Sequence, residues 1–128
     1  MSAALDLDAT KAALQAILAP KARNPRRRDF GDGGFYLDRA PVTVCADGLT
    51  FSMQTSFSHY CQPRDSDGPW YSVEIGFPSR RVEEFMPFIA GDDSEPTDTV
   101  YGYVPLDVVA AVVVAAGGLA APTSEGAE

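Results

Sequence analysis

Long hydrophobic runs are absent from this chain of 128 residues. The longest, Val108 to Ala116, has nine residues, whereas a membrane-spanning helix needs about 20. The first eight residues carry two aspartates and no base, unlike the basic start and apolar centre of a secretory signal peptide. We therefore expect no membrane span and no export, and predict a cytoplasmic protein.

Metal ligands and disulfide-forming residues are also scarce, since the chain has one histidine and two cysteines. His59, Cys45 and Cys61 do not have the paired spacing that is typical of zinc sites. Without an export signal, we interpret the cysteines as reduced thiols. The glycine cluster at 31–34 lacks the lysine and the following helix of a phosphate-binding loop, and the acidic run at 92–95 lacks the ligand pattern of an EF-hand. The sequence thus predicts no metal and no cofactor.

Two segments have the apolar spacing of helices. Hydrophobics make up 45% of the chain and charged residues 22%, which is typical of one folded domain. Helical spacing of Leu14, Ile17 and Leu18 predicts a helix near the N-terminus that ends before Pro20. A second apolar stripe follows Pro105, and Gly117-Gly118 is a typical helix stop. The residues of that stripe are Leu106, Val109, Val112 and Val113.

Between these helices the pattern changes to strands. We expect strands at 35–37, 42–46, 49–53, 70–77 and 100–104, and a short helical turn or edge at 82–86. Asp47-Gly48 is typical of a two-residue hairpin turn. Such a turn pairs Val44 with Phe51 and buries Val42 and Val44, with Thr43 and Cys45 on the opposite face. In the third strand, the alternation predicts one shared face. That face carries Tyr71, Val73, Ile75 and Phe77.

The order of these elements predicts an α+β fold. We expect an antiparallel meander of about four or five strands, packed with an N-terminal and a C-terminal helix. The predicted divisions are the N-terminal helix at 1–20, a basic and glycine-rich linker at 21–34, the α+β core at 35–118 and a disordered tail at 119–128.

Charge is distributed unevenly along the chain. Eighteen acids and ten bases give a net charge of -8. Residues 1–28 carry six bases and two acids, whereas residues from Val82 to the end carry nine acids and no base. The acids that would form a partner-binding face are Glu83, Glu84, Asp92, Asp93, Glu95 and Asp98. Such a face either serves solubility alone or binds a basic protein surface, such as that of a nucleic-acid-binding host protein, with carboxylates in place of phosphates.

The basic run from Lys21 to Arg28 contains five of the ten bases. Five cations would suit phosphates or an acidic partner. No aromatic residue lies among them to stack on the bases of a nucleic acid, and the rest of the chain is acidic. We interpret the run as an exposed linker and do not favour direct binding of nucleic acid.

A rival site is formed by His59, Tyr60, Cys61 and Arg64 beside a turn-rich loop at 62–69. A reactive thiolate needs a neighbouring base. However, residues two apart on a strand lie about 6.5 to 7 Å apart, too far for a direct hydrogen bond. We therefore favour a non-enzymatic protein, and keep a small enzyme or ligand-binding protein as the alternative.

A third possibility is a virion or assembly component, which would form a symmetric homo-oligomer. Its contact patch would then be an exposed Trp70 or the aromatic pair Tyr101 and Tyr103.

Three strings in the second half of the chain carry a resemblance. They are Ser58-His59-Tyr60-Cys61-Gln62-Pro63-Arg64, Val73-Glu74-Ile75-Gly76-Phe77-Pro78-Ser79 and Thr99-Val100-Tyr101-Gly102-Tyr103-Val104-Pro105. In these strings the chain resembles small uncharacterised proteins of phages, prophages and other mobile elements, over roughly Leu49 to Gly118. The resemblance implies an accessory role such as counter-defence, for example as a small acidic inhibitor of a CRISPR or restriction component. It implies no functional residue.

Overall fold

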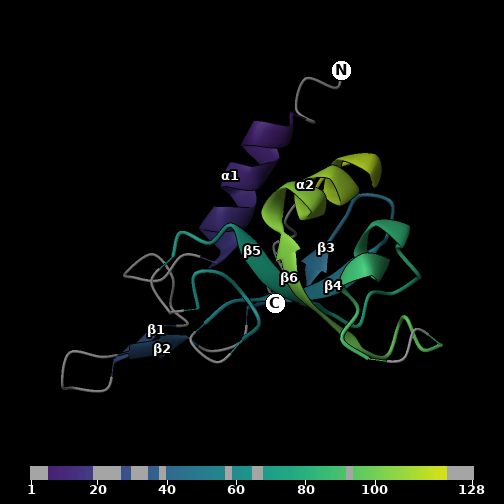
Figure 1. Ribbon diagram of the computed structural model, residues 1–128. Coiled ribbons are helices and arrows are strands. Elements are labelled where there is room, and N and C mark those ends of the chain that lie inside the picture. The colour runs from purple at the N-terminus through teal and green to yellow at the C-terminus, as the bar shows by residue number, and fades with distance from the viewer. Residues whose placement is uncertain are drawn as a thin grey trace.

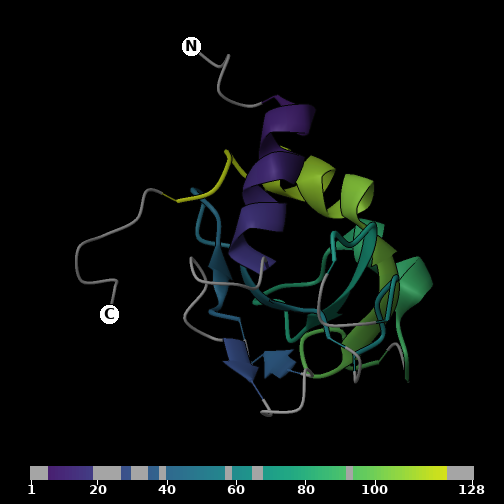
Figure 2. The same ribbon diagram turned by 90° about the vertical axis from the view of Figure 1, so that its left-hand side faces the viewer.

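Four strands joined in chain order form the centre of the fold. The computed structural model describes residues 6–18, 27–29, 35–37, 40–56, 59–64, 68–91 and 94–120. Strands β3 (Thr43–Val44), β4 (Thr50–Gln54), β5 (Ser72–Gly76) and β6 (Val100–Pro105) pair antiparallel in that order. Helices α1 (Leu7–Leu18) and α2 (Leu106–Ala115) lie beside each other on one side of this sheet (Figures 1 and 2). The predicted α+β fold, with an N-terminal and a C-terminal helix on an antiparallel sheet, is confirmed.

Helix α1 begins at a side-chain cap. One carboxylate oxygen of Asp6 accepts the backbone N–H groups of Asp8 at 2.7 Å and of Ala9 at 3.3 Å. These N–H groups have no partner within the helix, so the cap stabilises the first turn. Leu14 and Leu18, four residues apart on one face, are fully buried. The helix therefore docks through the apolar stripe that its spacing predicted.

Helix α2 follows β6 without a loop and ends at the predicted glycines. Gly117 and Gly118 have φ values of 90° and 92°, a left-handed conformation that glycine adopts without steric cost. The N–H of Gly118 donates to the carbonyl oxygen of Val113 at 2.8 Å and so closes the last turn.

Within the described ranges, no helix combines the length and the apolar character needed to cross a membrane.

The turn between β3 and β4 has three residues rather than the predicted two. The N–H of Cys45 donates to the carbonyl oxygen of Leu49 at 2.8 Å, and the N–H of Gly48 donates to that of Cys45 at 3.0 Å. Gly48 has a φ of 101°. A tight turn followed by a left-handed glycine is the usual geometry of a three-residue hairpin loop.

This extra loop residue shows that the predicted register is wrong by one position. Thr43, not Val44, pairs with Phe51. Because strand side chains alternate between faces, a slip of one residue exchanges the faces. Thr43 and Cys45 are therefore buried, while Val42 and Val44 are 61% and 43% exposed.

The free edge of β3 is covered by the chain that follows α2. The N–H of Ala46 donates to the carbonyl oxygen of Gly118, and the N–H of Ala120 donates to that of Val44, both at 2.8 Å. Leu119 and Cys45 form an isolated bridge. Residues 119 and 120, the first two of the predicted tail, are thus paired with the sheet edge, and the rest of that tail lies outside the described residues.

A separate pair of short strands precedes the sheet. Strand β1 (Arg27–Asp29) pairs antiparallel with β2 (Phe35–Leu37), and Figure 1 draws the pair apart from the four-stranded sheet. The strand expected at 35–37 is present. Arg27 and Arg28 end the basic run that we interpreted as a linker, and both lie in β1, whereas residues 21–26 lie outside the described residues.

Two of the three aromatic residues expected at an assembly surface are instead in the core. Trp70 and Tyr101 are fully buried, so neither is available as a contact patch, and that part of the assembly hypothesis is wrong. In β5 the shared buried face is shorter than predicted. Val73 and Ile75 are buried, whereas the side chains at positions 71 and 77 are exposed.

Candidate functional site

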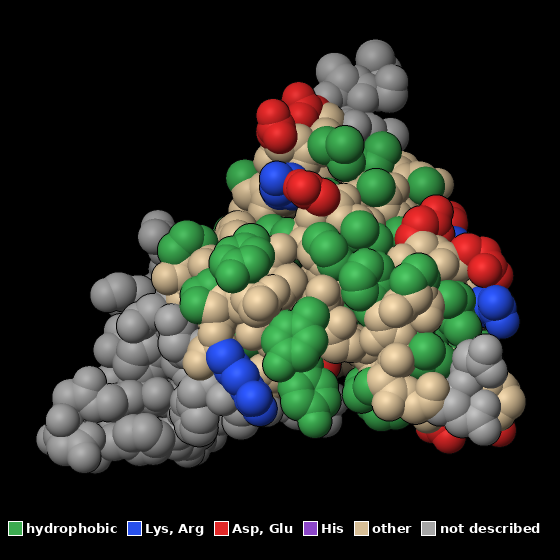
Figure 3. All heavy atoms as spheres, in the orientation of Figure 1, with side chains coloured by type: hydrophobic (Ala, Val, Ile, Leu, Met, Phe, Trp, Pro, Cys, Tyr) green, Lys and Arg blue, Asp and Glu red, His purple; other side chains and the backbone are tan. Residues whose placement is uncertain are grey.

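Acidic side chains lie on the short helix η2 (Glu83–Phe88) and on the segment just before β6. Four of the six predicted residues are described there, and all four are exposed. We call them the acidic surface: Glu83, Glu84, Glu95 and Asp98. Asp92 and Asp93 lie outside the described residues. Figure 3 shows acidic side chains in two separate places along the right-hand margin, with a basic side chain and hydrophobic side chains between them.

The core fixes the orientation of η2 through one aromatic side chain. Phe85 is fully buried. Its ring packs edge-on against Phe51, with centroids 5.6 Å apart, and at a tilt against Tyr101, with centroids 6.0 Å apart. Edge-on and tilted pairs are favourable arrangements of aromatic rings. With Phe85 directed inward, the preceding Glu83 and Glu84 face solvent.

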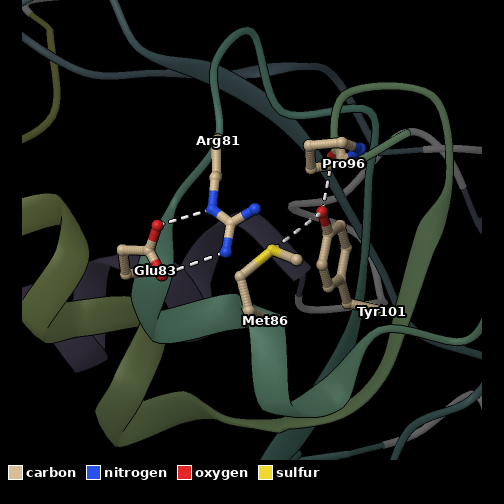
Figure 4. A network of polar contacts seen from close by, with 5 residues as sticks. All are labelled: Arg81, Glu83, Met86, Pro96 and Tyr101. Atoms are coloured by element: carbon tan, nitrogen blue, oxygen red, sulfur yellow. Dashed lines mark hydrogen bonds and ion pairs between the residues drawn. The ribbon is translucent and has the colours of Figure 1, made fainter. Parts of the chain in front are cut away.

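Tyr101 connects η2 with the second acidic segment. Its hydroxyl donates to the backbone carbonyl oxygen of Pro96 and lies 3.9 Å from the sulfur of Met86 (Figure 4). Burial raises the pKa of the Tyr101 phenol, so the hydroxyl keeps its proton and acts as a donor. A backbone bond of 2.9 Å from the N–H of Asp98 to Glu95 closes the turn beside it. One buried tyrosine therefore holds both parts of the acidic surface.

Arginines just before the base-free segment offset part of this charge. The Nε atom of Arg81 lies 2.5 Å from Oε2 of Glu83, and Nη2 lies 3.4 Å from Oε1 (Figure 4). Hydrogen bonds from this guanidinium lower the pKa of the Glu83 carboxyl. Arg81 directly precedes Val82, so the base-free segment from Val82 to the end of the chain does not include it. Among the described residues, Glu84, Glu95 and Asp98 form no ion pair.

A shallow hollow of about 260 Å³ lies between η2 and the end of α2. It is lined by Leu49, Arg80, Arg81, Val82, Glu83, Glu84, Val112, Ala115 and Ala116. Arg80 also pairs with Asp47 at 2.9 Å. A side chain of a partner that entered this hollow would meet both signs of charge beside an apolar floor.

In the rival site, His59 and Cys61 both contact Ser56. Nδ1 of His59 lies 2.6 Å from the hydroxyl oxygen of Ser56, within one turn of the chain. The fully buried sulfur of Cys61 lies 3.3 Å from the carbonyl oxygen of Ser56 and 3.5 Å from that of Pro63, and its one proton can be donated to either. Reactive thiolates need a partly exposed setting, whereas the Cys61 side chain is fully buried.

The other two residues of the rival site do meet. The guanidinium carbon of Arg64 lies over the Tyr60 ring, 5.5 Å from its centroid. A second ring, that of Tyr103, lies 5.9 Å from Tyr60, centroid to centroid, at an angle of 31°. No local pattern in the sequence signals this pair, because 43 residues separate Tyr60 and Tyr103.

The described residues hold no group of three or more histidine, cysteine and acidic side chains placed to bind a metal ion. Neither Cys45 nor Cys61, both described, is part of a disulfide, and both are buried. Burial raises the pKa of the Cys45 thiol.

Comparisons of the chain with protein-family models, curated proteins and solved structures found no match.

Proposed function

We propose that this chain is a small non-enzymatic binding protein whose acidic surface occupies a basic surface on another protein. The observation that carries the proposal is the fixed position of unpaired carboxylates. Glu84, Glu95 and Asp98 are exposed and outside any ion pair of the described residues, and buried aromatic rings hold their backbone. Preorganised charge of one sign speeds association with a complementary surface and selects against wrong partners.

The partner we propose is a nucleic-acid-binding protein of a host cell, met in the cytoplasm. The groove of such a protein binds phosphates through basic side chains. Carboxylates held at fixed positions compete for the same side chains. The resemblance to mobile-element proteins favours a defence component, such as a CRISPR or restriction protein, as that partner.

The test is capture of partners from a host lysate by the tagged full chain, at about 0.1 M and about 0.5 M NaCl, because salt screens exposed charge pairs. We expect one stoichiometric basic protein that is retained at low salt and released at high salt. The purified partner then allows association rates to be measured against variants of the acidic surface.

Two double variants with equal net charge separate a local effect from a general one. Glu84→Gln with Glu95→Gln alters the acidic surface, while Asp8→Asn with Asp107→Asn removes the same charge from α1 and the start of α2. We expect the first pair to slow association about tenfold at low salt and the second to change it little. Equal effects of the two pairs, or capture that is insensitive to salt, would refute the proposal. Loss of binding after His59→Ala alone would favour the rival site.

A further inference from the structure

A second exposed surface lies around the tyrosine pair, and its charge differs from that of the acidic surface. It consists of Tyr60, Tyr103, Arg64 and Glu74, and we call it the tyrosine surface. The two tyrosines are 44% and 42% exposed, although they lie against each other. Tyrosine and arginine are among the residues most enriched at the centres of protein interfaces.

An irregularity in the sheet builds this surface. Val73 pairs with Val104 and Ile75 pairs with Tyr101, so Gly102 and Tyr103 together stand opposite Glu74. This is a β-bulge, which turns a side chain away from its regular direction. The N–H of Tyr103 donates to the carbonyl oxygen of Tyr60 at 2.9 Å rather than across the ladder.

Neighbouring atoms pack closely at the bulge. A Cβ atom at Gly102 would lie 3.1 Å from Cβ of Tyr60, so the absence of a side chain there lets the two segments approach. One carboxylate oxygen of Glu74 accepts the N–H of Tyr60 at 3.0 Å. Tyr60 is thus fixed through its backbone on both sides, with its ring at the surface.

The conformation of Tyr103 is not one that folding alone would favour. Its φ is 55°, in the left-handed region that is sterically unfavourable for residues with a Cβ atom, and in which asparagine and glycine are the usual residues. A half-exposed ring recovers little of that cost through burial. Strained residues of this kind are concentrated at functional positions.

The charges of the tyrosine surface balance within a chain of net charge -8. Arg64 forms no ion pair with the described residues, and Glu74 uses one of its two carboxylate oxygens. Both contact Tyr60, one at the ring and one at the backbone. In a two-fold interface each residue of one copy meets the complementary residue of the other, so an exposed base and acid on the same patch complement themselves.

We propose that the tyrosine surface binds a second copy of this chain in a two-fold dimer. Tyr60 and Tyr103 of the two copies form its centre, and Arg64 of each copy pairs with Glu74 of the other. A nucleic acid fits less well, because Arg64 already lies over one tyrosine ring and the net charge of the chain repels a polyanion. The dimer leaves the acidic surface free and does not depend on the proposed function.

The experiment is sedimentation equilibrium of the full chain alone, from about 10 µM to about 1 mM, at about 0.1 M and about 0.5 M NaCl. We expect a concentration-dependent dimer that persists at high salt, because salt screens the repulsion between two acidic copies. This response is opposite to the salt-sensitive capture expected of the acidic surface, so one proposal can fail without the other.

Tyr103→Asn tests the centre of the interface without endangering the fold, because asparagine tolerates the left-handed conformation. We expect dimerisation to weaken at least about tenfold. Phe77→Asn is the matched control, since Phe77 is also exposed and has a φ of 51° but lies outside the tyrosine surface. It should leave dimerisation unchanged.

Charge exchange tests the two-fold pairing, most cleanly at Arg64, because Glu74→Arg also removes the acceptor of the Tyr60 N–H. Arg64→Glu and Glu74→Arg should each leave the chain monomeric, because like charges then face each other across the axis. Mixing the two folded variants should restore a mixed dimer. A chain that stays monomeric at the highest concentration overturns the proposal and leaves the surface to a different partner. A dimer that responds equally to Tyr103→Asn and Phe77→Asn, or a mixture that stays monomeric, overturns it too.

Discussion

Replacement of Tyr101 by phenylalanine removes one hydroxyl from the core and keeps the ring that packs on Phe85. The lost hydrogen bond to Pro96 should cost about 1 kcal/mol, the usual net value for a bond inside a protein. Pro96 is partly exposed, so water can reach its carbonyl oxygen and the cost should not rise far above that value. In a domain of this size the melting temperature should fall by about 4 °C.

The same change should loosen the acidic surface. The N–H of Asp98, bonded to Glu95 at 2.9 Å, should exchange with solvent deuterium faster than in the wild type, because its turn is no longer held to the core. Urea unfolding and amide exchange measure the two effects. Tyr71→Phe is the control, since it removes a hydroxyl from an exposed side chain. Equal stability and equal exchange in the two variants would refute the role of Tyr101 as an anchor.

The pH dependence of this effect has a defined sign. The pKa of Tyr101 in the folded protein is raised above its ordinary value of 10.0 by burial. The unfolded chain therefore loses this proton first as the pH rises. The stabilising contribution is complete below pH 10.0 and is lost as the pH rises through the folded-state pKa. The stability difference between the wild type and Tyr101→Phe should thus be constant below about pH 9 and shrink above pH 10. A difference that grows with pH would contradict this account.

Two further predictions concern the hairpin and the thiols. The hydroxyl of Thr43 is buried without a hydrogen-bond partner, so Thr43→Val should stabilise the fold by about 1 kcal/mol in urea unfolding. Val42→Thr, at an exposed position, should change stability by less than about 0.5 kcal/mol. The opposite order of effects would support the register that pairs Val44 with Phe51. Cys45 and Cys61 are buried, so a thiol reagent should label both only as fast as the chain unfolds, and rapid labelling of the native protein would contradict their placement.

Local sequence signals predicted most of the elements correctly. Gly117-Gly118 ends α2 as expected, and Asp47-Gly48 lies in the turn between β3 and β4. Both act within a few residues, through the backbone conformation that glycine permits. The register of the hairpin depended on more distant contacts. Pairing of residues 118–120 with β3 covers that strand edge. Two valines alternate with Thr43 and Cys45 along the strand, and either pair could be buried, so the local pattern did not determine the register.

In the candidate site too, some features could be predicted from the sequence and others depend on the tertiary structure. Composition by itself predicted an acidic segment after Val82, because charge is a property of each residue. Its attachment to the core through Tyr101 follows from how η2 and β6 pack, whereas Glu83 pairs with Arg81 only two residues away. The sequence alone determined the fold class, the position of most elements and the imbalance of charge. The tertiary structure decided which face of each strand is buried and which distant side chains meet, because those depend on the packing of the whole chain rather than on neighbouring residues.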